Sequence, residues 1–294
     1  MSVYLVCEGS TDGLDVRALN LVIVNKLGRE VQIESAGGDR SLGSVAHYLA
    51  ERYHAQTYVI EDRNYRSLEE AEQAWSQPNQ KWWMWRRHEI ENYLLDPRLV
   101  ADAFRALKMA HVRGTEVLPS DSEAAFHLLQ ELARPMLEDH AGWLTYWCLV
   151  SHKRNTADTR LLWPDPPLRP APDLAYPGRA EWLDYLRSES IRLKQACGQI
   201  SGDNTFDESA IVEMYDHVLS QVTHPDFLAS GRFLLDLGGH ELMSALCTYV
   251  NRAGVSRLSH SDLATELVNA LDRLYEPEFF EPDDFAQLAD RITR

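Results

Sequence analysis

The sequence has few cysteines and no long apolar run, and each of these features argues against certain classes of protein. The four cysteines are far apart and form no C-x-x-C pair, which argues against a disulfide framework or a zinc knuckle: Cys7, Cys148, Cys197 and Cys247. No stretch approaches the roughly 18 apolar residues of a membrane span. No charged segment followed by an apolar run marks a secretory signal. We therefore expect a cytoplasmic protein with reduced thiols.

Positive charge is also scarce. The 294 residues include 29 Lys and Arg against 45 Asp and Glu, a formal net charge of -16. Such a chain is not built to bind nucleic acid by overall electrostatic attraction, so such binding would need a local basic patch, a metal or a partner's surface. Gly37 and Gly38 lack the spacing of a nucleotide-binding loop. If ATP drives the system, we expect the ATPase to be another chain.

The first hundred residues alternate between short apolar runs and amphipathic segments. We expect strands at 3–7, 31–35, 57–60 and about 81–86, with helices at 12–27, 42–53 and through 69–72. Gly28 is well placed to end the first helix. This alternation predicts an α/β fold with a mostly parallel sheet flanked by helices.

The remaining chain shows mostly helical patterns. We expect helices at 98–110, 122–139, about 142–155, 179–197, 208–222, 240–253, 260–274 and 282–292, and a surface loop in the proline-rich segment 164–172. The expected domains are 1–96 plus about 230–255 as the catalytic domain, 97–229 as a large helical insertion for dimerisation or partner docking, and 256–294 as C-terminal helices.

Acidic residues follow three of the predicted strands. The pairs are Glu8 with Asp12, Glu61 with Asp62, and Glu89 with Glu91. Because the carboxyl ends of parallel strands meet at one edge, these clusters could form one site for Mg²⁺ or Mn²⁺, which prefer oxygen ligands. Glu61 is expected to face away from its neighbour. In the alternative interpretation, Asp12 is only a charge at a helix N-terminus that the helix dipole stabilises, and Asp62 only caps the next helix.

Four segments resemble a known family. They are Glu8-Gly9-Ser10-Thr11-Asp12 followed by Asp62-Arg63-Asn64, then His88-Glu89-Ile90-Glu91-Asn92-Tyr93-Leu94-Leu95, and finally Gly238-Gly239-His240-Glu241-Leu242-Met243. Together they resemble the TOPRIM domain of OLD-type nucleases and of related stand-alone proteins encoded beside ABC-type ATPases in anti-phage defence. The resemblance covers about residues 1–96 and 230–250.

The resemblance implies roles for individual residues. Glu8, Asp12 and Asp62 would be metal ligands, and Glu91 or Glu89 a further ligand. Asn64 stands where the family has a second aspartate, and would supply a neutral oxygen ligand. His240 stands where the family has a lysine; a histidine there can contact a phosphate or move a proton. The implied catalytic residues are thus Glu8, Asp62 and His240, with Mg²⁺ or Mn²⁺ as cofactor.

Two basic clusters could contact nucleic acid. Arg86 and Arg87 follow Trp82, Trp83 and Trp85, an arrangement that could form an aromatic, basic platform for bases. The alternative is that alternation on a buried strand places at least two of these tryptophans in the core. A second cluster contains Lys153, Arg154 and Arg160, for which the alternative is a solvated helix face.

Two functions are consistent with these features. The first is a metal-dependent TOPRIM-type endonuclease that cleaves DNA or RNA as the toxic effector of a bacterial anti-phage system. It would be controlled by an ABC-type ATPase partner and would act as a homodimer, with no membrane involved. The second is a catalytically weak TOPRIM-like subunit that only regulates that ATPase.

Overall fold

The computed structural model describes residues 2–110, 114–154, 176–197, 207–253 and 258–292. The chain divides into two compact units, residues 1–129 with 234–294 and residues 130–233. The first unit contains the sheet together with α5 (Pro97–Met109) and α13 (His260–Leu274). These two helices bury apolar faces and lie against each other.

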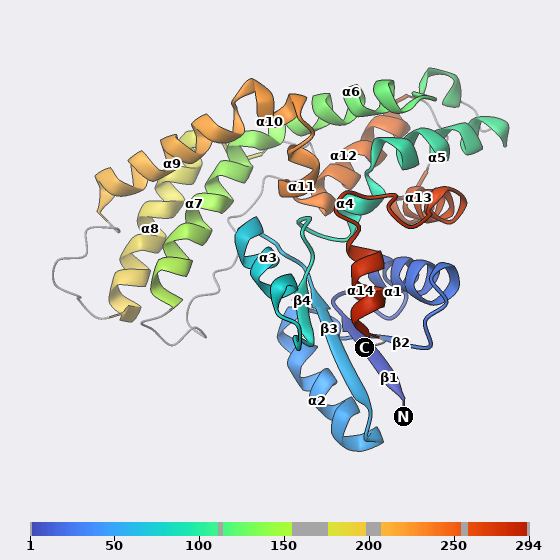
Figure 1. Ribbon diagram of the computed structural model, residues 1–294. Coiled ribbons are helices and arrows are strands. Elements are labelled where there is room, and N and C mark those ends of the chain that lie inside the picture. Colours follow the sequence, from blue (N-terminus) through green and yellow to red (C-terminus); the bar gives the residue numbers. More distant parts are fainter. Residues whose placement is uncertain (1, 111–113, 155–175, 198–206, 254–257, 293–294) are drawn as a thin grey trace. The chain divides into compact units, whose positions relative to one another are not determined.

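The first unit is built on a four-stranded, all-parallel sheet (Figure 1). Its strands are β1 (Val3–Cys7), β2 (Gln32–Ser35), β3 (Gln56–Glu61) and β4 (Trp82–Met84), in the order β2-β1-β3-β4. The predicted α/β class and parallel sheet are confirmed. This order places the carboxyl ends of β1, β3 and β4 next to one another.

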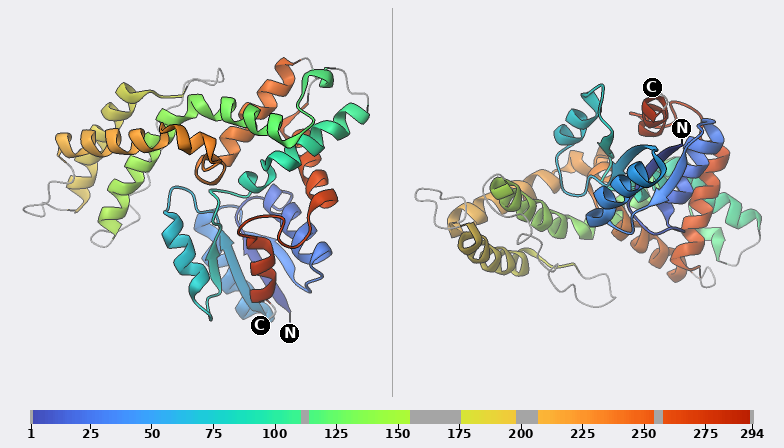
Figure 2. Two further views of the ribbon diagram at one scale, coloured as in Figure 1. Left: turned by 45° about the horizontal axis from the view of Figure 1, so that its top comes forward. Right: turned by 90° about the horizontal axis from the view of Figure 1, so that it is seen from below.

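Helices connect the strands and complete this unit. They are α1 (Leu14–Leu19) with its π-helical continuation η1 (Asn20–Lys26), the short 3-10 helix η2 (Asp39–Ser41), α2 (Leu42–Tyr53), α3 (Leu68–Ser76), α4 (Glu91–Leu94), α5, the 3-10 helix η3 (Thr115–Val117), α6 (Ser122–Ala133), α11 (Phe233–Asp236), α12 (Gly239–Arg252), α13 and α14 (Asp284–Ile292). Helices α6 and α11 cross the boundaries between the units. Helix α14 packs against η1 (Figures 1 and 2).

Local sequence explains several element ends. Ser67 and Glu70 form a reciprocal capping box that starts α3. Asp96 caps α5 immediately before a proline. Gly28, with a φ of 65°, ends the first helix as expected, since this backbone conformation favours glycine. The first helix begins at Leu14, two residues later than expected, and its second half is π-helical.

The core of the sheet unit combines aliphatic and aromatic residues. Helix α2 packs Leu42 and Leu49 against Tyr4, Val6 and Val59 of the sheet. A separate aromatic stack includes Tyr58, Trp75 and Trp83. Trp83 and Trp85 are each 1% exposed, so two of the three neighbouring tryptophans lie in the core, whereas Trp82 is 37% exposed.

The second unit is helical. It contains the 3-10 helix η4 (Arg134–Met136), α7 (Leu137–Arg154), α8 (Arg179–Cys197), α9 (Glu208–Val222) and α10 (Pro225–Ala229). Helices α7, α8 and α9 lie side by side (Figures 1 and 2). Trp182 fills the space beside Gly142, where an added Cβ would come within 1.9 Å of the indole ring. The expected proline-rich loop lies outside the described residues. Among the helices that the structure describes, none is long and apolar enough to cross a membrane.

Candidate metal site at the carboxyl edge of the sheet

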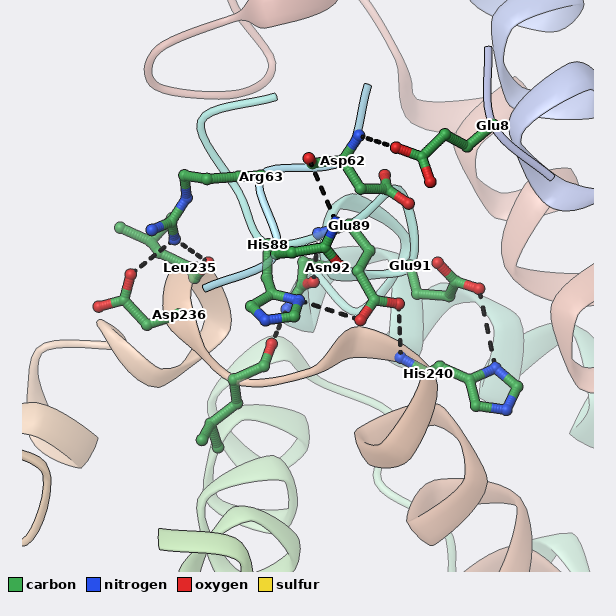
Figure 3. A network of polar contacts seen from close by, with 12 residues as sticks. Glu8, Asp62, Arg63, His88, Glu89, Glu91, Asn92, Leu235, Asp236 and His240 are labelled. Atoms are coloured by element: carbon green, nitrogen blue, oxygen red, sulfur yellow. Dashed lines mark hydrogen bonds and ion pairs between the residues drawn. The ribbon is translucent and has the colours of Figure 1, made fainter. Parts of the chain in front are cut away.

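Carboxylates from three adjacent strand ends come together at one edge of the sheet. Glu8 follows β1, Asp62 follows β3, Glu89 lies in the turn after β4, and Glu91 begins α4 (Figure 3). The backbone amide of Asp62 donates a 3.0 Å hydrogen bond to Oε1 of Glu8, which joins the first two strand ends directly. Asp62 Oδ1 is buried and has no hydrogen-bond partner among the described residues.

The acidic side chains at this edge all hold their protons more tightly than usual. The pKa values of Glu8, Glu89 and Glu91 are each raised to about 7, that of Asp15 to about 8, and that of Asp62 well above its ordinary value. Burial is the largest cause in each case, and repulsion from neighbouring carboxylates adds to it. A bound cation would remove this penalty.

A second acidic residue, Asp15, lies close to the residue Asp12 that the sequence points to. Asp12 is exposed in the turn before α1, whereas Asp15 lies buried in the first turn of the helix. The pKa of Asp15 rises because of burial and, next, the charge of Glu91, so the two carboxylates lie near enough to repel each other. The ligand role of Asp12 stays a prediction. The available signal for the burial of Asp15 was the glycine at 13, which delays the start of the helix.

Gly9 makes this arrangement possible. Its φ of 86° lies in the left-handed region, and a Cβ there would come within 2.6 Å of Asp15 Oδ2. The glycine of the Glu8-Gly9 turn thus lets the Asp15 carboxylate approach the backbone immediately after β1.

Asn64 lies in the turn after β3. Its φ is 52°, a conformation that asparagine tolerates better than most residues. Its side-chain amide donates a 3.4 Å hydrogen bond to the carbonyl of Asp62, and its backbone amide donates to the carbonyl of His88. Through these contacts Asn64 links two strand ends as a turn residue. They account for its conformation without the predicted ligand role, which stays a prediction.

The two arginines after β4, which the sequence predicts to contact nucleic acid, both contact other residues of the protein. Arg86 is 7% exposed and forms ion pairs with Asp284 of α14 and Glu72 of α3. Arg87 donates to the carbonyl of Asn92 and stacks over Tyr93. A guanidinium committed to a buried carboxylate is not available to a phosphate.

The other predicted contact cluster cannot be placed. Lys153 and Arg154 fall at the end of α7, where the structure does not describe the side chains. Arg160 lies outside the described residues.

Arg63 is a structural residue that the sequence did not point out. It is 4% exposed, pairs with Asp236 at 2.7 Å and donates to the carbonyls of Arg66 and Leu235 (Figure 3). It therefore ties the end of β3 to the segment that leads into α12. No local pattern in the sequence could show this, because Leu235 and Asp236 lie more than 170 residues away.

The turn after β4 is joined to the segment before α12 by backbone and side-chain contacts. The amide of His88 donates to the carbonyl of Leu235 at 2.8 Å, and Nδ2 of Asn92 donates to the carbonyl of Leu237 at 2.9 Å. A Cβ on Gly239 would come within 2.6 Å of Asn92 Oδ1. Two motifs that lie about 150 residues apart are thus packed together, and the second requires a glycine.

His240 lies at the rim of the acidic edge. It is carried by the first turn of α12, its side chain is 63% exposed, and its Nδ1 is 4.0 Å from Oε1 of Glu91. The ring of His260, at the start of α13, lies 5.2 Å away between ring centroids. The pKa of His260 is lowered by burial and by the charge of His240. His260 was not expected from the sequence.

The donor set suits a hard divalent cation. Four carboxylates, those of Glu8, Asp15, Glu89 and Glu91, lie near enough to Asp62 for their charges to raise its pKa, and the buried Oδ1 of Asp62 lacks a protein partner among the described residues. Within the part of the chain that the structure describes, however, no three His, Cys, Asp or Glu side chains are close enough together to enclose an ion as they stand. Glu8 accepts a hydrogen bond from the amide of Asp62, so an ion would have to draw the carboxylates inward.

Comparison with known proteins names no relative. No family model, no curated protein and no solved structure matches the chain. The functional assignment therefore rests on the acidic edge and on the motifs that surround it.

Proposed function

We propose that the protein is a Mg²⁺- or Mn²⁺-dependent phosphodiester hydrolase, a nuclease with a TOPRIM-like catalytic domain. The observation that carries the proposal is the group of buried carboxylates at adjacent strand ends of a parallel sheet, with Asp62 Oδ1 left without a partner among the described residues. Ligands bind at this edge in open α/β sheets. Burying several carboxylates without a cation costs stability, so their retention favours a function for them.

The proposal assigns roles to five residues at this edge of the sheet. Glu8, Asp15, Asp62 and Glu91 hold the divalent ion or ions. When bound, the metal would stabilise the charge that develops on the phosphate oxygens during in-line displacement. His240, exposed beside Glu91, contacts the phosphate of the substrate.

The TOPRIM resemblance gives the proposal its biological setting. The Glu8-Gly9 turn, the 88–95 segment and the 238–243 segment lie on the same unit, and the last two are in contact. The family implies a toxic effector of anti-phage defence that is restrained by an ABC-type ATPase. An acidic nuclease that needs a partner before it cuts is compatible with a net charge of -16. We include homodimerisation in this proposal.

A second candidate is a regulatory subunit with a weakened site. It is favoured by Asn64, whose amide is turned to the Asp62 carbonyl where a carboxylate is expected, and by His240 in place of a lysine. Such a subunit would bind its ATPase and metal without cleaving nucleic acid.

Metal-dependent cleavage separates the two candidates. The purified chain, alone and with its ATPase, is incubated with plasmid, single-stranded DNA and total RNA in Mn²⁺ or EDTA. The nuclease proposal expects cleavage in Mn²⁺ that is lost in EDTA and in Asp62→Asn. Binding to the ATPase with no cleavage under any of these conditions would favour the regulatory subunit.

A further inference from the structure

Both oxygens of the Glu89 carboxylate face hydrogen-bond donors of the protein. Oε1 lies 3.0 Å from Nδ1 of His88, and Oε2 accepts a 3.2 Å hydrogen bond from the backbone amide of His240 (Figure 3). Glu89 therefore caps the first turn of α12, where the backbone amides of a helix have no partner within the helix.

The environment of His88 makes its Nδ1 a hydrogen-bond donor to Glu89. Its side chain is 3% exposed, and burial together with the charge of Arg63 keeps the ring neutral. A neutral imidazole that faces a carboxylate oxygen carries its proton on that nitrogen, so Nδ1 donates. The side chain of Glu89 is thus held from two directions.

The neighbouring contacts limit where Glu89 can move. The amide of Glu89 donates to Asn92 Oδ1 at 3.0 Å, and Asn92 in turn donates to the carbonyl of Leu237. These hydrogen bonds join the 88–92 turn to the start of α12 at several points. The first turn of α12 carries His240, so the position of that histidine depends on this junction.

We propose that Glu89 is a positioning residue that fastens the first turn of α12 to the turn after β4 and so holds His240 beside Glu91. It does not ligate the ion. Ion binding falls to the other four carboxylates, Glu8, Asp15, Asp62 and Glu91. The part of this inference that concerns the ion and His240 rests on the proposed function; the fastening of α12 does not.

Three substitutions test whether Glu89 positions the first turn of α12 or binds the ion. Glu89→Gln keeps an acceptor oxygen for the amide of His240 but removes the charge, Glu89→Ala removes both, and Glu91→Gln removes a proposed ligand. Glu241→Gln is the charge-matched control, because Glu241 is close enough for its charge to raise the pKa values of both glutamates. All four variants are compared with the wild-type chain in Mn²⁺ titrations and in the cleavage assay.

We expect Mn²⁺ affinity to fall in both Glu89 variants by no more than in Glu241→Gln. In Glu91→Gln it should fall further, by roughly 10–100-fold, the loss typical even for residues that only orient a ligand. Cleavage should be largely retained in Glu89→Gln and lost in Glu89→Ala. Equal losses of Mn²⁺ affinity in Glu89→Gln and Glu91→Gln would overturn the assignment.

Amide hydrogen exchange tests the fastening without metal or activity. In the metal-free protein, Glu89→Ala should speed exchange at the amide of His240 by about fivefold, the factor for a hydrogen bond worth about 1 kcal/mol. Exchange should be near wild-type in Glu89→Gln and Glu241→Gln. Unchanged exchange in Glu89→Ala would refute the fastening. If the wild-type chain bound no Mn²⁺ at all, the proposed function would fail while this comparison would still decide the role of Glu89 in α12.

Discussion

Replacing Glu91 by glutamine should stabilise the metal-free protein while weakening its hold on metal. Burial, followed by repulsion from Glu89, raises the pKa of Glu91 from its ordinary 4.5 to about 7. Keeping this carboxylate ionised above pH 7 therefore costs up to about 3 kcal/mol of folding free energy. Glutamine has nearly the same shape and no charge. For a chain of this size the gain corresponds to roughly 5–10 °C in Tm.

The effect should depend on pH with a definite sign. The folded state holds the proton more tightly than the unfolded state, so the penalty is absent below about pH 4.5, grows up to about pH 7 and is complete above it. Thermal unfolding in EDTA at about pH 8 should therefore show Glu91→Gln to be more stable than the wild-type protein, and at about pH 4.5 the two should coincide.

Mn²⁺ should reverse the order of stability of the two proteins, and a control variant tests whether the effect is specific to Glu91. Mn²⁺ stabilises whatever folded protein binds it, so the wild-type chain should gain more than the variant. Glu213→Gln replaces an exposed glutamate of α9 and should change stability by no more than about 0.5 kcal/mol. A Glu91→Gln variant that is no more stable than wild type at pH 8 in EDTA would refute the claim that the edge is electrostatically strained.

Further predictions concern the other residues around the edge. Asp15→Asn should abolish Mn²⁺ binding in a calorimetric titration while Asp12→Asn retains it; the opposite result would restore Asp12 as the ligand. Gly239→Ala should destabilise the protein by about 1–3 kcal/mol, because the new Cβ overlaps Asn92, and should reduce cleavage; a variant with wild-type Tm and cleavage would show that the close approach is unimportant. Arg86→Met should cost about 3–5 kcal/mol in urea unfolding because it leaves buried carboxylate charge uncompensated; unchanged Mn²⁺ affinity would agree with its structural role, and a loss confined to nucleic-acid binding would contradict it.

The sheet and its acidic edge could be predicted from local sequence. The apolar run before Glu8 and the run before Asp62 each fill a buried strand, and strand patterns of this kind need no long-range information. The helix at 42–53 was predicted with its observed bounds. The adjacency of the three acidic strand ends then follows from the strand order.

The choice between Asp12 and Asp15 could not be made from spacing alone. A carbonyl of Ser10 accepts from the amide of Gly13, and this turn delays the helix until Leu14. Asp12 is left in the turn, and Asp15 is turned back toward Gly9. A shift of two residues in the start of a helix is a small error in secondary structure, but it changes which carboxylate is buried.

The role of Arg86 depended on a distant partner. Next to three tryptophans, an arginine is typical of a nucleic-acid surface, and nothing nearby contradicts that interpretation. Its partner Asp284 lies 198 residues later, on α14, and only the fold brings the two together. Tyr93 donates to the same carboxylate, so part of the 88–95 motif serves packing rather than chemistry.

Crystals of the protein soaked in Mn²⁺ would test the metal site most directly, through an anomalous difference map. The account predicts a peak at the carboxyl edge of the sheet, within about 2.0–2.6 Å of an oxygen of Asp62 and of a second carboxylate from Glu8, Asp15 or Glu91. An ordered edge with no peak, although Mn²⁺ is present at millimolar concentration, would contradict it.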